Sequence, residues 1–147
     1  MTDAAQVVVD LLNTREHSIH QDTLDPSADL LRALRSDLLA VIADPTDATH
    51  AWAAFSARVS DIEFRQDFSI PGEVHHHQTA GDPTVGTLVK AVSTLVQSGN
   101  WSRIRLCANK PCAAAFYDTT RSRTRRWHSY EICGNRTNVA AHRARTT

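Results

Sequence analysis

The sequence predicts an α+β fold: a mainly helical N-terminal domain with a small β-hairpin over residues 1–100, followed by a smaller C-terminal module over residues 101–147. Three segments of the first part repeat apolar residues at three- and four-residue steps, as amphipathic helices do. Another segment alternates apolar and polar residues around a Pro-Gly turn. All three cysteines lie between residues 107 and 133, which sets the C-terminal part of the chain apart.

Residues 5–14 fit two kinds of element. The run Val7-Val8-Val9 favours a strand, whereas Leu11-Leu12 fits a strand or a helix equally well. Residues 15–26 are polar and end in Asp25-Pro26, which predicts a loop.

Two amphipathic helices are predicted next. The first covers about 28–43, and either Ser27 or Asp29 can cap its N-terminus. The second covers about 48–63 and has Asp47 as its expected cap. The apolar positions of both recur at helical spacing, so each helix presents one stripe to a core.

A β-hairpin and a third helix complete the N-terminal domain. Residues 64–79 alternate in polarity, and Pro71-Gly72 marks the turn between two strands. Residues 83–97 have helical periodicity, and Gly99 follows as a residue after a helix C-terminus often does.

The cysteines are arranged for binding a metal ion. Four residues separate Cys107 from Cys112, and four separate His128 from Cys133. Two short-range pairs of these donors suit tetrahedral zinc, and four protein ligands leave no open position, so we expect a structural zinc ion held by these residues. The other interpretations are three ordinary buried cysteines with a surface histidine, and His142 as the fourth ligand.

The spacing of the second pair predicts its local structure. On a regular helix five residues separate two side chains by about 140° on the helical wheel, so both cannot face one ion from mid-helix. We therefore place His128 just before a helix and Cys133 in its first turns, with Ser129 as the N-cap. A cysteine knuckle, a short β-element and ligands at a helix start predict a treble-clef-like zinc finger.

Charge divides the chain into two opposite parts. The formal net charge is zero, but residues 101–147 carry ten Lys/Arg and two acids, and residues 1–100 carry six Lys/Arg and fourteen acids. The net charges are therefore +8 and −8, which indicates two regions with different roles. The basic part can meet nucleic acid, an acidic partner, or the acidic part of its own chain.

Membrane and secreted classes are not expected. The sequence has no apolar run of the ~18 residues that a membrane span needs. The N-terminus lacks a basic region followed by an apolar segment, and clustered cysteines in a reducing compartment are more often metal ligands than disulfides. We expect a cytoplasmic protein.

Arginines follow and interleave with the metal-ligand pairs. On a strand, residues 121, 123 and 125 would share one face, and on the last helix Arg136 and Arg143 fall together. Such sets can contact phosphates, or form a solvated face or pair with the acidic half. The predicted nucleic-acid-binding residues are Arg121, Arg123, Arg125, Arg126, Arg136 and Arg143. Arg126 can also stack on Trp127.

Two further clusters are polar. Asn13 and Arg15 follow the first apolar segment, where they can line a ligand pocket or only cap and bond local backbone. His75-His76-His77 can bind a metal weakly, but a surface hairpin is the interpretation that we favour. The sequence shows no Gly-rich phosphate loop, nucleophile elbow or paired-carboxylate motif, so it gives no positive indication of an enzyme.

The C-terminal part resembles the CGNR zinc finger. The matching motifs are Arg105-Leu-Cys107-Ala-Asn-Lys-Pro-Cys112, the arginine-rich run to His128, Cys133-Gly134-Asn135-Arg136, and His142 to Arg145. The family usually has cysteine where His128 stands. Upstream, residues 9–15 resemble the opening motif of the ABATE domain that precedes such fingers.

The resemblance implies a bacterial, stress-related transcription regulator. Its structural zinc finger over 101–147 would bind DNA, and its ABATE-like domain over 1–100 would sense a small-molecule effector or form a homodimer. The alternative is a small-molecule-binding protein or an enzyme, with the zinc as a structural staple and a pocket between the N-terminal domain and the finger.

Overall fold

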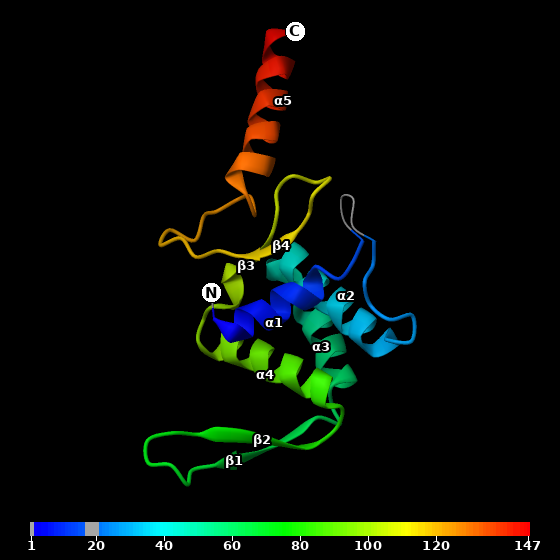
Figure 1. Cartoon of the computed structure of the whole chain (residues 1–147), viewed down its shortest axis with the longest axis vertical. Helices are drawn as coiled ribbons and strands as arrows, with labels where there is room; N and C mark the ends of the chain where they lie inside the picture. Colours follow the sequence, from blue (N-terminus) through cyan, green and yellow to red (C-terminus); the bar gives the residue numbers. More distant parts are fainter. Residues whose placement is uncertain (1, 17–20) are drawn as a thin grey trace.

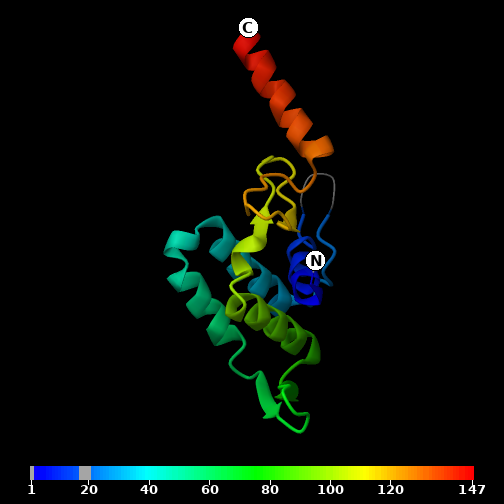
Figure 2. The same ribbon diagram turned by 90° about the vertical axis from the view of Figure 1, so that its left-hand side faces the viewer.

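The computed structural model describes residues 2–16 and 21–147, and within them a helical body separates a β-hairpin from a small C-terminal finger (Figure 1). The hairpin projects from one end of the body and the last helix projects from the other, as the view turned by 90° also shows (Figure 2). The predicted α+β class is confirmed. The body contains α1 (Asp3–Leu12), α2 (Asp29–Ala43), α3 (Thr49–Arg58) and α4 (Pro83–Gln97).

The first apolar segment is the helix α1 and not a strand. Thr2 caps it by accepting a hydrogen bond from the backbone N–H of Ala5 at 3.3 Å. Ala5, Val8, Val9 and Leu12 lie one helical turn apart and are buried on one face. Burial of this face decides the structure, because the local preference of three valines for a strand is weak.

The predicted helices are present, and α4 has its predicted bounds, but the caps of the first two differ and α3 ends early. Ala28 occupies the N-cap of α2 and makes no side-chain cap, so neither Ser27 nor Asp29 fills that role. Asp47 caps no helix. Instead the carboxylate of Asp44 accepts from the backbone N–H groups of Thr46 and Asp47, in the 3-10 turn Pro45–Asp47 that precedes α3. α3 ends at Arg58, five residues before the predicted end, because the next strand already begins at Glu63.

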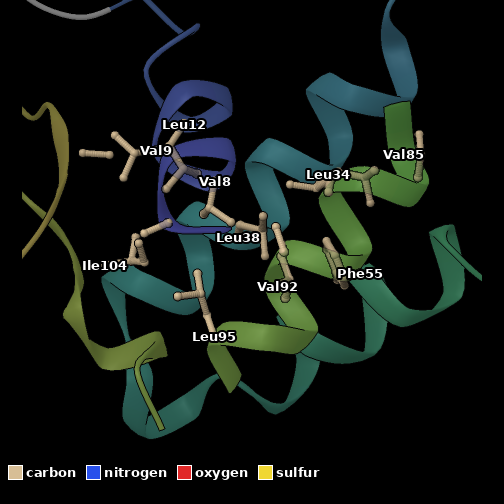
Figure 3. Packing of buried hydrophobic residues seen from close by; sticks show 14 residues of the cluster. Val8, Val9, Leu12, Leu34, Leu38, Phe55, Val85, Val92, Leu95 and Ile104 are labelled. Atoms are coloured by element: carbon tan, nitrogen blue, oxygen red, sulfur yellow. The ribbon is translucent and has the colours of Figure 1, made fainter. Parts of the chain in front are cut away.

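The core lies where α1, α2 and α4 meet, with α3 covering one side (Figure 3). It also takes residues from the finger, because Ile104 and Ala115 are buried in the same cluster. Among the largest buried side chains are Val8, Leu12, Leu34, Leu38, Val41 and Leu95. No helix within the described residues is both long and apolar enough to cross a membrane.

The predicted hairpin is formed by β1 (Glu63–Asp67) and β2 (His75–Ala80), which pair antiparallel with Asp67 opposite His75. Gly72 adopts φ 80° at the turn, a conformation that favours glycine. The three histidines of β2 are exposed. His75 lies 2.9 Å from Glu73 and His77 lies 3.3 Å from Asp67, as on an ordinary solvated surface.

The finger begins with a second hairpin, which packs on the helical body. Its strands are β3 (Ile104–Leu106) and β4 (Ala115–Tyr117), and a 3-10 turn (Trp101–Arg103) leads into β3. β4 lies against α1 and β3 lies against α2. The chain then forms a π-helical turn, η3 (Tyr130–Gly134), which continues directly into α5 (Asn135–Thr146).

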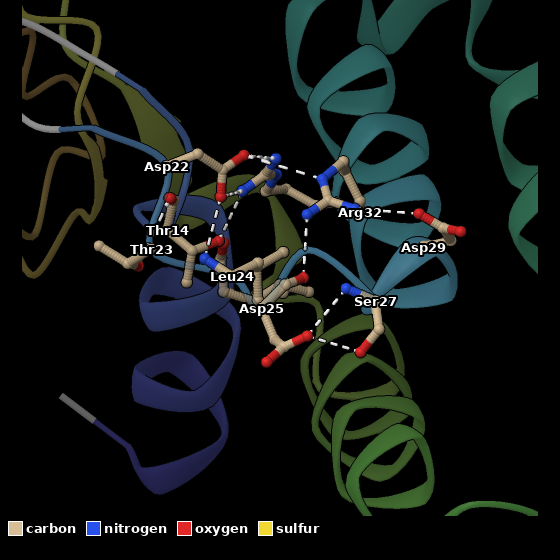
Figure 4. A network of polar contacts seen from close by, with 10 residues as sticks. Thr14, Asp22, Thr23, Leu24, Asp25, Ser27, Asp29 and Arg32 are labelled. Carbon is tan, nitrogen blue, oxygen red and sulfur yellow. Dashed lines mark hydrogen bonds and ion pairs between the residues drawn. The ribbon is translucent and has the colours of Figure 1, made fainter.

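A polar network joins α2 to the segment that precedes it. Arg35 is only 6% exposed, and its guanidinium pairs with both carboxylate oxygens of Asp22, at 3.1 and 2.5 Å. It also donates to the hydroxyl of Thr14, and Figure 4 shows Thr14, Asp22 and Arg32 side by side. The hydrogen bond from Arg35 lowers the pKa of Asp22 to about 2. Residues 17–20 of the predicted loop lie outside the described residues.

Candidate metal centre

The first pair of ligand candidates lies on the turn between β3 and β4. The N–H of Cys107 donates to the carbonyl of Ala114 at 2.8 Å, which closes the turn. The carbonyl of Asn109 accepts from the N–H groups of Cys112 and Ala113, both at 2.9 Å. These backbone bonds bring the two sulfur atoms to the same side of the knuckle.

The second pair enters at a helix start, as the five-residue step from His128 to Cys133 predicts. Ser129 caps η3 by accepting from the N–H of Ile132 at 3.2 Å, with His128 just before it and Cys133 within its single turn. The turn is wider than a regular helix, because the N–H of Gly134 donates to the carbonyl of Ser129, five residues back. A Cβ at Gly134 would lie 2.7 Å from the ring of Tyr130, so this turn needs glycine.

The four side chains converge on one point. The sulfur atoms of Cys107, Cys112 and Cys133 and a ring nitrogen of His128 all lie within 4.8 Å of one another. Nδ1 of His128 is 3.3 Å from Sγ of Cys112 and 3.6 Å from Sγ of Cys133. The edges of a tetrahedron around zinc measure roughly 3.5–3.8 Å for these ligands, so the group has the size of a zinc site. His142 does not belong to this group.

Burial and charge tune the four groups. Burial, followed by the nearby charge of Arg125, lowers the pKa of His128, which favours the neutral imidazole that binds metals. Burial raises the pKa of the Cys112 thiol to about 11 in the absence of an ion. The Cys133 pKa is lowered despite its burial, because hydrogen bonds from Asn109 and the neighbouring cysteines and the charge of Arg136 outweigh the desolvation.

A buried carboxylate organises the loop between β4 and His128. Asp118 is 0% exposed and accepts from the backbone N–H of Thr120 and of Arg125, each at 2.9 Å. It also lies 3.5 Å from the guanidinium of Arg105. Sequence reasoning did not single out Asp118, although it is one of only two acids among residues 101–147. The scarcity of acids in this basic part of the chain is the signal that could have pointed to Asp118.

The arginine-rich segment is a turn and a loop, so its residues do not share the face of a strand. Arg125 points inward: its Nε donates to the carbonyl of Trp127 at 2.8 Å, and Nη2 donates to the carbonyl of His128. Its guanidinium also lies 5.2 Å from the ring centre of Phe116. Arg126 stacks on Trp127 at 5.2 Å, as predicted. Arg121, Arg123 and Arg126 are exposed.

Asn13 and Arg15 connect α1 and the residues after it to the knuckle. The side-chain amide of Asn13 donates to the carbonyl of Ala115 at 3.0 Å and accepts from its N–H at 2.8 Å. Nη2 of Arg15 donates to the carbonyl of Ala113 at 2.5 Å. These bonds give both residues a structural contact with the finger, and a role in a ligand pocket stays a prediction.

Comparison with known proteins agrees with this geometry. The CGNR zinc finger family model matches residues 103–146, which contain all four members of the cluster. None of the curated proteins matches the chain. The family match and the Cys3His group together support a structural zinc ion in the C-terminal part of the chain.

Proposed function

We propose that the chain is a DNA-binding transcription regulator, in which Cys107, Cys112, His128 and Cys133 hold zinc and α5 binds DNA. The observation that carries the proposal is the position of α5, which projects from the finger with no element covering it among the described residues (Figures 1 and 2). Its residues are exposed except for the partly exposed Thr137. A helix presented in this way can enter the major groove, which is about 12 Å wide.

The charge of α5 suits a phosphate backbone. The helix carries Arg136, Arg143 and Arg145 and contains no acid. Asn135, Arg136, Val139, Ala140 and Arg143 line one shallow hollow of about 330 Å³, so two of the arginines lie on a common face. Phosphate contacts from such a face would position the helix, and Asn135 or Asn138 could read base edges.

Zinc has a mechanical role in this proposal. α5 continues directly from η3, and η3 contains the ligand candidate Cys133. With zinc bound, the base of α5 is tied to the knuckle and through β3 and β4 to the helical body. In the same proposal the ABATE-like residues 1–100 sense an effector or form a homodimer.

The test is the salt dependence of binding to a fluorescein-labelled 25-base-pair duplex, measured by anisotropy with zinc-loaded protein. Each phosphate contact contributes a slope of about −0.9 in log K against log salt. We expect Arg136→Gln together with Arg143→Gln to weaken binding at least about 10-fold and to reduce the slope by about 2.

Arg65→Gln is the matched control, because Arg65 is exposed on the hairpin at the other end of the molecule (Figure 1). It should leave the affinity and the slope unchanged. Equal slopes for the double variant and the wild type would contradict the role of α5.

A further inference from the structure

A cleft of about 570 Å³ lies between the C-terminal end of α2 and the chain that leads into β3. This volume is within the usual range for small-molecule sites, roughly 300–1,000 Å³. The cleft is separate from the metal centre, since none of the four zinc-ligand candidates lines it. The residues that line the cleft include Ile42, Ala43, Trp101, Leu106, Arg105 and Arg123.

The wall of the cleft is apolar and partly rigid. Ile42 and Leu106 are half-buried against the core, and Ile104, which also lines the cleft, is almost fully buried. Trp101 is held in place by Trp52, whose ring centre is 5.1 Å away. A fixed indole beside branched aliphatic side chains suits an aromatic or branched apolar body.

The charged residues of the lining are both arginines, and no carboxylate joins them among the described residues. Arg105 is partly neutralised, because Nη1 lies 3.5 Å from the carboxylate of Asp118. Arg123 forms no ion pair within the described part of the chain, and its Nη1 donates only to the carbonyl of Gly99, at 3.3 Å. The cleft therefore has a free positive charge at one side.

The backbone at Arg123 is held in a conformation that costs energy. Its φ of 54° is unusual for a residue with a side chain, and Arg105 stabilises it by donating to the carbonyl of Arg123 at 2.8 Å. The two arginines are thus coupled, and Arg123 lines the cleft.

We propose that this cleft binds a small organic acid with one carboxylate and an aromatic or branched apolar body. The apolar body packs against Trp101, Ile42 and Leu106. The carboxylate pairs with Arg123, because a planar guanidinium can form two parallel hydrogen bonds with a carboxylate. The inference does not depend on DNA binding, because it rests on a different set of residues.

The test uses 1-naphthoate as the probe and its neutral amide, 1-naphthamide, as the matched comparison. Binding to the full-length, zinc-loaded protein is followed by the assigned indole N–H signal of Trp101 in two-dimensional NMR spectra, without nucleic acid. We expect a saturable shift of this signal with a Kd of about 1 mM or tighter, and at least about fivefold weaker binding of the amide.

Two variants locate the probe. Arg123→Gln should weaken 1-naphthoate binding at least about fivefold, whereas Arg121→Gln, an exposed arginine of the same loop outside the cleft, should leave it unchanged. Ala43→Trp, which fills the cleft from its rim, should abolish binding.

Three results would overturn the proposal: no saturable shift of Trp101, equal binding of the acid and the amide, or equal effects of the two arginine variants. A failure of DNA binding would leave this result untouched, so the two proposals are tested separately.

Discussion

His128 gives the metal centre its individual character. Three thiolates and a neutral imidazole around Zn²⁺ carry a net charge of about −1, where four thiolates would carry −2. Its Nδ1 lies 3.3 Å from Sγ of Cys112 and 3.6 Å from Sγ of Cys133, so the ring is already aimed into the cluster. The lowered pKa keeps the ring neutral and ready to bind near pH 7.

Replacing His128 tests its place among the ligands. His128→Ala should lower zinc affinity on the order of 100-fold or more, because three ligands and a water replace four protein ligands. Competition with a chromophoric chelator measures the affinity. His128→Cys is the control, and it should keep one zinc per chain. Unchanged affinity in His128→Ala would remove this residue from the site.

The pairing of Asp22 with Arg35 predicts a pH dependence of stability. The pKa of Asp22 is about 2 in the folded protein, below its ordinary value of 3.8, so the carboxylate stabilises the fold above about pH 4. This stabilisation is lost as the pH falls toward 2.

The measurement compares the unfolding free energies of wild type and Asp22→Asn from pH 6 downward. The difference in unfolding free energy between the two proteins should be constant above about pH 4 and should shrink below it. Asp61→Asn, at an exposed position, is the control for a surface amide. A difference that stays constant through pH 3 would show that the ion pair does not stabilise the fold.

Elements with strong periodicity could be predicted from the sequence, but the end of α3 and the caps of α2 and α3 could not. α2, α4 and the β1–β2 hairpin lie within a few residues of their predicted bounds. α1 was ambiguous because three adjacent valines suit a strand, and only packing against α4 decides for a helix. The π-helical form of η3 and the close approach of Tyr130 to Gly134 were not predicted, because no pattern in the sequence reveals them.

Breaking α5 should separate DNA binding from metal binding. Proline at Ala140 removes a backbone donor in the middle of the helix and costs about 3 kcal/mol of helix stability. We expect at least about 10-fold weaker binding to the labelled duplex, with one zinc per chain retained because the four ligand candidates precede residue 135. Ala140→Ser is the control. Loss of zinc in Ala140→Pro would show that α5 is part of the metal site.

At the scale of the molecule, the charge division seen in the sequence corresponds to a division in space. The basic residues 101–147 form the finger, including α5. The acidic residues 1–100 form the helical body and the β1–β2 hairpin (Figure 1). The spacing of the four ligand candidates was enough to predict their convergence. The bond from Asn13 to Ala115 was not predictable, because 102 residues separate the two.

If zinc positions α5 for DNA, then DNA binding must depend on zinc. Zinc is titrated into the metal-free protein while the anisotropy of the fluorescein-labelled duplex is followed. The account predicts that binding appears in step with zinc and saturates at one equivalent, because the ion fixes η3 and therefore α5. Full binding by the metal-free protein, with the same salt slope, would contradict it.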